Sequence, residues 1–153
     1  QPDAVVCGAN SVQDLKEVLG DGINGLIHAD ITVARTNEKA AKGLAAYVEE
    51  YKSRYNQELW SAHSIRTYAG AMVFFEALKS AKSFSSDDIA EACRAIDIPL
   101  YDTATGWGCK FDETGQNTRA LSFGCVWYEG NPVSCWPKEA AVEGVDFTLP
   151  WRY

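Results

Sequence analysis

The side chains best placed for binding chemistry follow two short apolar runs near the start of the chain. Asn10 and Ser11 come shortly after the run 4–7. Asp30 comes directly after the run 25–29. Both runs are typical of buried strands, and an open α/β sheet binds ligands beyond the carboxyl ends of its strands. We therefore expect an amide, a hydroxyl and a carboxylate at one edge of a sheet, where the carboxylate could meet an ammonium group.

A local role is the alternative for each of these residues. Asn10 and Ser11 are also good helix caps, and Asp30 is a common residue in turns. His63 precedes a long apolar stretch, where either a structural histidine or a ligand contact fits. His28 lies within the second apolar run, which favours the structural role for that residue.

Several motifs that resemble catalytic or cofactor sites have simpler explanations. The sequence 20–25 matches G-x-G-x-x-G, but a dinucleotide loop must follow a strand and open a helix, whereas these glycines follow a predicted helix and precede a strand. Asp87 and Asp88 are typical of a helix start, and Glu49 and Glu50 of a solvated helix face. No G-x-S-x-G or H-E-x-x-H occurs in the sequence. We expect no catalytic constellation and no cofactor.

Cysteine usage does not indicate a metal site. The five cysteines are Cys7, Cys93, Cys109, Cys125 and Cys135. None forms a C-x-x-C pair, whereas zinc sites draw on tighter clusters. We interpret most of them as small buried apolar residues. Cys125 and Cys135 flank a predicted turn and could form a disulfide in an oxidising compartment if the register places them opposite each other.

The composition limits the possible partners. The chain has 153 residues, 46% of them hydrophobic, and a net charge of −7, which fits one soluble domain without a basic surface. Nucleic-acid binding is disfavoured because it depends on neutralising phosphates. The longest apolar stretch, 69–78, is interrupted by Glu76 and is too short for a membrane span. The first residues lack the basic start and apolar run of a secretory signal.

The elements that must position the candidate side chains follow from periodicity. Strand 4–7, a helix with its apolar face on Val12 to Leu19, a stop at Gly20 and strand 25–29 predict a parallel βαβ unit. A second helix begins at Thr36 or Asn37. A third runs to about residue 81; its middle, 69–77, is apolar on nearly all sides and is expected to pack on more than one side. Residues 85–88 cap a fourth helix.

The last third has a different character. Trp107, Cys109 and Phe111 alternate as in a strand, and a turn follows at 112–115. Strands 121–128 and 133–136, joined by a turn, predict an antiparallel hairpin. The chain therefore divides into a βαβ element (1–36), a helical segment (37–100) and a strand and hairpin segment with a tail (101–153).

The order of several motifs resembles one family. The motifs are 45–55, 67–72, 76–81, 111–117, 126–131 and 136–137. In this order and spacing they resemble the C-terminal part of the periplasmic substrate-binding proteins of branched-chain amino acid ABC transporters, the leucine/isoleucine/valine-binding type. The resemblance covers about residues 8–137.

This resemblance implies an α/β fold that is part of a type I periplasmic-binding-protein-like two-lobe fold, with a parallel βαβ sheet and a C-terminal antiparallel hairpin. In the family, two lobes close over an amino acid, and the early strands of the first lobe, whose loops hold the ligand α-carboxylate, have no counterpart in this sequence. The loop that carries an acid for the ligand ammonium matches a loop with Asn10 here, so Asp30 or Asp14 would replace that acid. Trp60 and His63 lie near a position where an aromatic group lines the pocket.

The function implied is that of an extracytoplasmic solute-binding component of an ABC importer, with an amino acid ligand and a membrane permease as partner. The alternative is a ligand-sensing regulator or receptor domain on the same scaffold. An enzymatic role, as a small α/β hydrolase or reductase, lacks a nucleophile with an adjacent base. A chain without the other lobe would expose apolar surface, so we expect a homodimer or a rearranged packing of helices.

Overall fold

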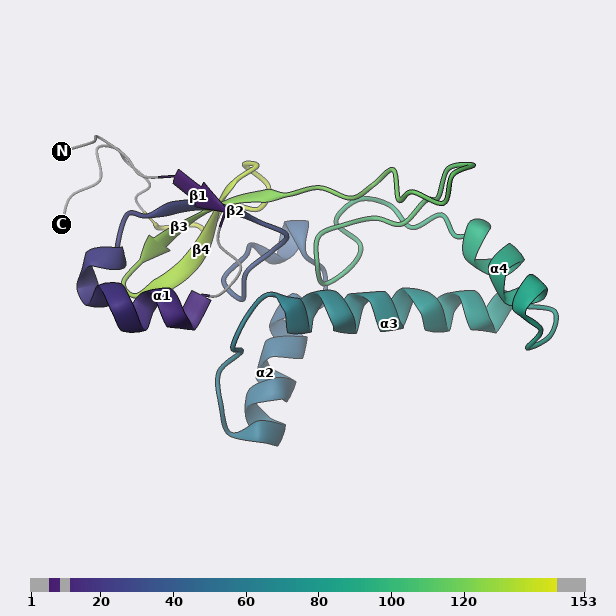
Figure 1. Ribbon diagram of the computed structural model, residues 1–153, viewed down its shortest axis with the longest axis horizontal. Coiled ribbons are helices and arrows are strands. Elements are labelled where there is room, and N and C mark those ends of the chain that lie inside the picture. The colour runs from purple at the N-terminus through teal and green to yellow at the C-terminus, as the bar shows by residue number, and fades with distance from the viewer. Residues whose placement is uncertain (1–5, 9–11, 146–153) are drawn as a thin grey trace.

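The first apolar runs pair as parallel strands in the computed structural model, which describes residues 6–8 and 12–145. Strand β1 (Val6–Gly8) lies beside β2 (Ile27–Asp30) in parallel. Between them come helix α1 (Val12–Leu19) and the 3-10 helix η1 (Gly20–Ile23). The predicted parallel βαβ unit is confirmed, and the glycine motif does follow a helix and precede a strand (Figure 1).

The predicted antiparallel hairpin completes the sheet. Strands β3 (Phe123–Tyr128) and β4 (Asn131–Trp136) pair with each other, and β3 also pairs antiparallel with β2, which gives the strand order β1-β2-β3-β4. The turn is shorter than expected, because Glu129 and Gly130 alone form it. Both have positive φ, 50° and 70°, the geometry whose twist matches that of a tight hairpin.

The register of this hairpin separates Cys125 from Cys135. An irregularity between Gly124 and Cys125 places Cys125 opposite Ser134. The thiol of Cys135 instead donates to the carbonyl oxygen of Gly124 at 3.2 Å. All five cysteines are free thiols in this structure.

The helices follow the predicted order, but the second begins at Leu44 and not at Thr36 or Asn37. A short 3-10 helix, η2 (Glu38–Ala40), precedes α2 (Leu44–Tyr55). Gly43 between them has φ +80°, a left-handed conformation that interrupts a continuous helix. Helices α3 (His63–Ser80) and α4 (Ser86–Arg94) follow.

The alternating residues 107–111 do not form a strand. The segment makes only isolated bridges, Ile98 with Cys109 and Phe111 with Asn117. Local bonds direct its backbone into turns instead: the hydroxyl of Thr103 donates to the carbonyl of Trp107 at 2.7 Å. The alternation of apolar residues at 107–111 did not indicate that the backbone groups of this segment form hydrogen bonds outside a sheet.

The described core consists of separate clusters rather than one. Phe123, Cys125 and Val33 pack on one side of the sheet, and Ile23, Leu26 and Trp127 pack near α1. A third cluster joins α2 to the first half of α3; its buried members are Ala41, Leu44, Val48, Ile65, Ala69 and Ala104.

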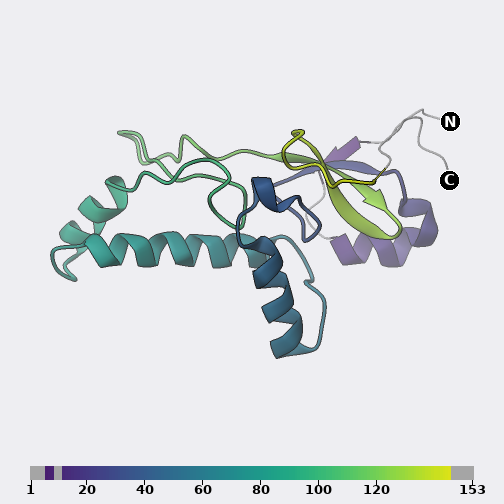
Figure 2. The ribbon, with the colours of Figure 1, turned by 180° about the vertical axis from the view of Figure 1, so that it is seen from behind.

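Helix α3 extends from the sheet towards α4 at the far end of the molecule, as both views show (Figures 1 and 2). Its middle packs along one side only, with Ala69 and Ala77 buried, and not on more than one side as expected. Met72 and Phe75 are 44% and 53% exposed, because nothing in the described part of the chain covers that face. None of the described helices is long and apolar enough to cross a membrane.

Candidate ligand-binding wall

Asp30 is the last residue of β2, and its carboxylate is held in a defined orientation. The backbone N–H of Ile31 donates to Asp30 Oδ1 at 2.7 Å. The other oxygen, Oδ2, lies 4.0 Å from Nδ1 of His28, too far for a hydrogen bond. The Asp30 side chain is only 8% exposed.

The charge of this carboxylate is poorly compensated. Burial raises the pKa of Asp30, while the Ile31 N–H and the more distant charges of His63 and Arg66 act in the opposite direction. Among the described residues, no lysine or arginine nitrogen lies within 4.0 Å of it. A cation that approached Oδ2 would therefore supply an interaction that the described protein groups do not.

His28 lies next to this carboxylate in the sheet interior. Its side chain is fully buried, and neither ring nitrogen has a hydrogen-bond partner among the described residues. Burial lowers the pKa of His28, with Asp30 opposing that shift. The imidazole is therefore neutral near pH 7 and does not neutralise Asp30.

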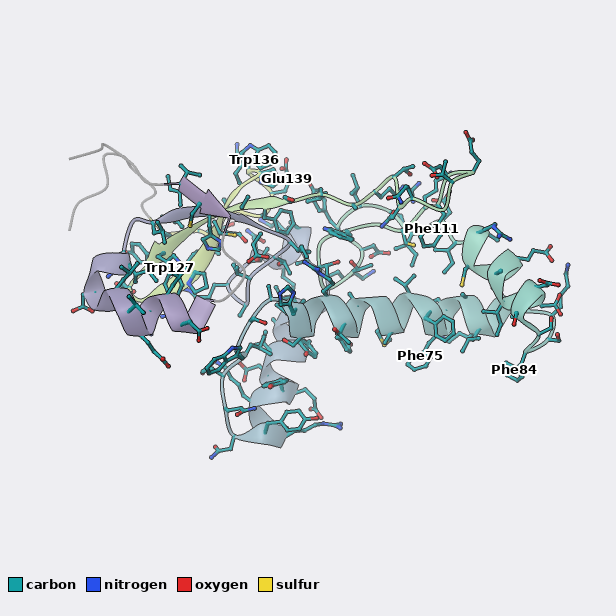
Figure 3. All side chains as sticks on the ribbon, in the orientation of Figure 1. Phe75, Phe84, Phe111, Trp127, Trp136 and Glu139 are labelled. Atoms are coloured by element: carbon teal, nitrogen blue, oxygen red, sulfur yellow. The ribbon has the colours of Figure 1, made fainter. Side chains whose placement is uncertain are left out.

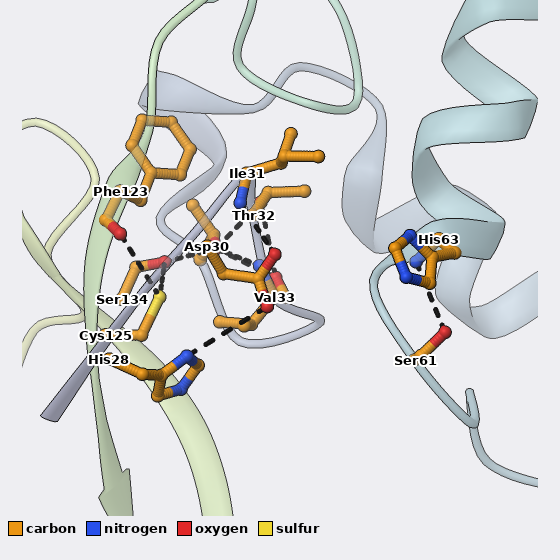
Figure 4. A network of polar contacts seen from close by, with 11 residues as sticks. His28, Asp30, Ile31, Thr32, Val33, Ser61, His63, Phe123, Cys125 and Ser134 are labelled. Atoms are coloured by element: carbon orange, nitrogen blue, oxygen red, sulfur yellow. Dashed lines mark hydrogen bonds and ion pairs between the residues drawn. The ribbon is translucent and has the colours of Figure 1, made fainter. Parts of the chain in front are cut away.

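Hydrogen bonds between hydroxyl groups connect strand β4 to the segment that comes after Asp30 (Figure 4). Thr36 Oγ1 lies 3.1 Å from Thr32 Oγ1 and 2.6 Å from Ser134 Oγ. Ser134 in turn lies 3.8 Å from the thiol of Cys125. Burial raises the pKa of Cys125 to about 12, so this thiol stays protonated and is not a nucleophile.

The start of α3 contributes His63, another predicted site residue, whose charge acts to lower the pKa of Asp30. The backbone N–H of His63 donates to Ser61 Oγ at 3.3 Å, which fixes the first turn. His63 is exposed, and Figure 4 shows it at the start of α3 with Ser61, apart from the group around Asp30. Arg66, one turn further along α3, also acts on Asp30 and was missed by the sequence reasoning. Its spacing of three residues from His63 was the available signal.

The other predicted site residues either lie away from Asp30 or are not among the residues that the structure describes. Trp60 lines a cavity that does not include Asp30 or His63. Asn10 and Ser11 lie outside the described residues. Asp14, the alternative acid, is exposed in the first turn of α1. No group of three or more potential metal ligands occurs in the described part of the chain.

Comparison with known proteins identifies the family. The sequence profile of the periplasmic binding proteins matches residues 4–127. The chain belongs to the periplasmic binding protein family. This is a family of binding proteins, not of enzymes, and it agrees with the resemblance inferred from the motifs. Such a family indicates an extracytoplasmic location.

Curated relatives match nearly the whole chain. Leu/Ile/Val-binding protein homolog 8 of Brucella abortus (strain 2308) is 37% identical over 150 residues, which is 96% of this chain and 37% of the relative. Leu/Ile/Val-binding protein homolog 7 of Brucella suis biovar 1 (strain 1330) is 36% identical over 148 residues, 95% of this chain and 37% of the relative. The chain thus spans little more than a third of the length of these relatives.

Solved structures share the fold. The leucine binding protein LivK of Thermotoga maritima MSB8 superposes with a TM-score of 0.60 at 25% identity, over 81% of this chain and 33% of that protein. An extracellular ligand-binding receptor of Rhodopseudomonas palustris HaA2 gives a TM-score of 0.58 at 19% identity, over 84% of this chain and 39% of the receptor. The structure is therefore a partial periplasmic-binding-protein fold, as predicted.

Proposed function

We propose that this chain is the C-terminal portion of an extracytoplasmic solute-binding component of an ABC importer, and that it forms one wall of an amino acid site. The names of the Brucella relatives refer to leucine, isoleucine and valine, which supports a branched-chain or related amino acid. A membrane permease is the partner that such a component requires.

The observation that carries the proposal is the Asp30 carboxylate. It is oriented by Ile31 N–H, nearly buried, and lacks a close cation among the described residues. A ligand ammonium at Oδ2 would form a charge-assisted hydrogen bond in a site with little competing water. The charges of His63 and Arg66 act on the pKa of this carboxylate, and in this proposal the two side chains contact other polar atoms of the ligand.

Binding would act through closure of two lobes. A ligand that contacts both walls stabilises the closed form over the open form by its differential affinity. Closure excludes water and strengthens the few polar contacts to the zwitterion. In this proposal Asn10 and Ser11 also contact the ligand, and the permease recognises the closed form.

A ligand-sensing regulator or receptor domain is the second candidate. It would use the same scaffold and the same binding step, without a permease as partner. Neighbouring genes for a permease and an ATPase favour transport, whereas a neighbouring kinase or antiterminator gene favours sensing.

Calorimetric titration tests the proposed site. The product of the complete open reading frame is titrated with a panel of amino acids, and we expect at least one to bind. Asp30→Asn should then weaken binding by at least about tenfold, the effect of losing one charge-assisted hydrogen bond. Glu113→Gln, which removes an exposed carboxylate in the turn after Phe111, should bind as the unaltered protein does. Absence of binding to every zwitterion, or unchanged binding by Asp30→Asn, would contradict the proposal.

A further inference from the structure

A cavity lies between β4, α2 and the loop that precedes α3. Its volume is about 490 Å³, within the range of small-molecule sites. Asp30, His63 and Arg66 do not line it. The cavity is therefore distinct from the candidate wall described above, and the amino acid proposal leaves it without a role.

The floor of this cavity is apolar. Val33, Val48 and Ile65 line it, and all three are buried. Trp60 lines the cavity as well and is 60% exposed, which is unusual for so large an apolar ring. A floor of branched side chains with an accessible indole suits a ligand with an apolar or aromatic body.

Two cations without an ion-pair partner stand around this floor. Arg35 is half-buried and Lys16 exposed, and neither forms an ion pair with any residue in the described ranges. Lys52, also at the cavity, is already bound to Glu58 at 3.1 Å. Free cations at one cavity are notable in a chain with a net charge of −7.

Arg35 and Lys16 both lie beside the hairpin that borders the cavity. The carbonyl oxygen of Arg35 accepts from the N–H of Ser134 at 2.9 Å, and Arg35 forms a parallel bridge with Val133, so it is anchored to β4. Lys16 lies against Gly130, where an added Cβ would be 3.4 Å from its Nζ. Arg35, in the segment after β2, is therefore anchored beside β4, and Lys16, in α1, lies beside the hairpin turn.

We propose that this cavity binds a small organic monocarboxylate with an apolar or aromatic body. The planar guanidinium of Arg35 pairs with the carboxylate in a fork, and Lys16 adds a second positive charge. The body lies on the apolar floor against Trp60. Glu49, which also lines the cavity, disfavours a doubly charged anion such as a phosphate monoester. This site does not depend on the proposed amino acid function.

Fluorine NMR titration with 4-fluorophenylacetate tests the site in the product of the complete open reading frame. We expect a dissociation constant of about 1 mM or tighter, as for a well-seated fragment of this size. The uncharged 4-fluorophenylacetamide should bind at least about tenfold more weakly, because it lacks the charge-assisted pair. Arg35→Gln and Trp60→Ala should each weaken binding of the acid, and Arg35→Lys should weaken it less than Arg35→Gln.

Controls separate this site from the amino acid site. Arg94→Gln, which removes an arginine from the last turn of α4, should leave the affinity for 4-fluorophenylacetate unchanged. Asp30→Asn should also leave it unchanged; loss of the probe in that variant would place the probe at Asp30 and overturn the inference. Equal binding of acid and amide, or unchanged binding by a folded Arg35→Gln variant, would overturn it as well. Failure of every amino acid to bind would count only against the proposed function.

Discussion

At the residue scale, His28 and Asp30 set the electrostatics of the wall. They lie two positions apart in β2, so their side chains share one face of the sheet. Burial lowers the pKa of His28 and raises that of Asp30, which favours the neutral form of each. Neither side chain stabilises the charge of the other at hydrogen-bond distance. A ligand cation beside Asp30 would therefore favour its ionised form, which His28 does not do at hydrogen-bond distance.

The first prediction concerns the pH dependence of stability. Because the pKa of His28 is below its ordinary value of 6.5 in the folded state, the unfolded state binds more protons below pH 6.5. The free energy of unfolding should fall on acidification through that window, by at most about 1.4 kcal/mol per pH unit. Urea unfolding of the protein between pH 7.5 and 5.5 measures this, at about half-unit steps.

The variant His28→Gln should flatten this slope, and His63→Gln tests whether the slope belongs to His28. Asp30 has the opposite effect on stability at pH values above its ordinary pKa of 3.8. Because its pKa is raised in the folded state, the folded state binds more protons there than the unfolded state, so acidification increases the free energy of unfolding. A stability that rises on acidification from neutral pH would contradict the assignment of a buried neutral imidazole.

A second prediction at this scale concerns Gly106. It has φ +76°, and a Cβ there would clash with the carbonyl oxygen of Ala40 and the ring of Phe123. Gly106→Ala should cost about 3 kcal/mol of unfolding free energy, from strain and overpacking together. Gly115→Ala is the matched control, because Gly115 has φ +85° and open space, so only about 1 kcal/mol of conformational strain remains. Equal losses in thermal unfolding of the two variants would contradict the packing around Phe123.

At the element scale, local chemistry accounts for where the helices begin and end. Ser85 accepts from the N–H of Asp88 at 3.2 Å at the start of α4. Gly20, with φ +54°, follows the end of α1. These signals are readable in the sequence because each depends on one residue and its immediate neighbours.

The third prediction tests the cap of α4. Ser85→Ala removes the side-chain acceptor and should cost about 1 kcal/mol. Ser86→Ala, one residue further on, removes a hydroxyl from the same helix start without removing the cap, and should change stability by less than about 0.5 kcal/mol. Chemical denaturation of both variants provides the comparison, and equal effects would argue against the capping role of Ser85.

Features that depend on partners distant in the sequence could not be predicted in this way. The strand that ends at Asp30 and its parallel partner were predicted, because apolar runs and glycines mark them. The link from Thr36 to Ser134 joins residues 98 positions apart, so no local pattern indicates it. The alternation at 107–111 was misleading for the same reason, since long-range packing decides whether such a segment joins a sheet. Asp30 and His63 were predicted from the sequence as site residues and stay predictions, and Arg66 was not among them.

At the scale of the whole molecule, the main feature is an apolar face of α3 that is exposed to solvent. Met72 and Phe75 lie on it, and Phe75 and Phe84 point away from the rest of the described chain (Figure 3). Exposed apolar side chains in a row on one helix mark an interaction surface. The curated relatives are much longer than this chain, which spans 37% of them. A chain of 153 residues alone would leave this face in contact with water.

The fourth prediction follows from that face. The 153-residue chain should self-associate, and sedimentation velocity should show a dimer or larger species. Replacing both Met72 and Phe75 by lysine should shift the distribution towards the monomer, because each charge opposes burial of the face. Ser86→Lys adds the same charge to α4 and should leave the distribution unchanged. A monomer with a cooperative thermal transition in the unaltered chain would contradict this expectation.

The central claim is that Asp30 recognises the ammonium group of an amino acid. Its most direct test compares L-leucine with 4-methylpentanoate, which has the same carboxylate and side chain but no amino group, in calorimetric titrations of the product of the complete open reading frame. We predict that leucine binds at least about tenfold more tightly, and that Asp30→Asn removes this preference. Equal affinities for the two compounds, or a preference for leucine that survives in Asp30→Asn, would contradict the account.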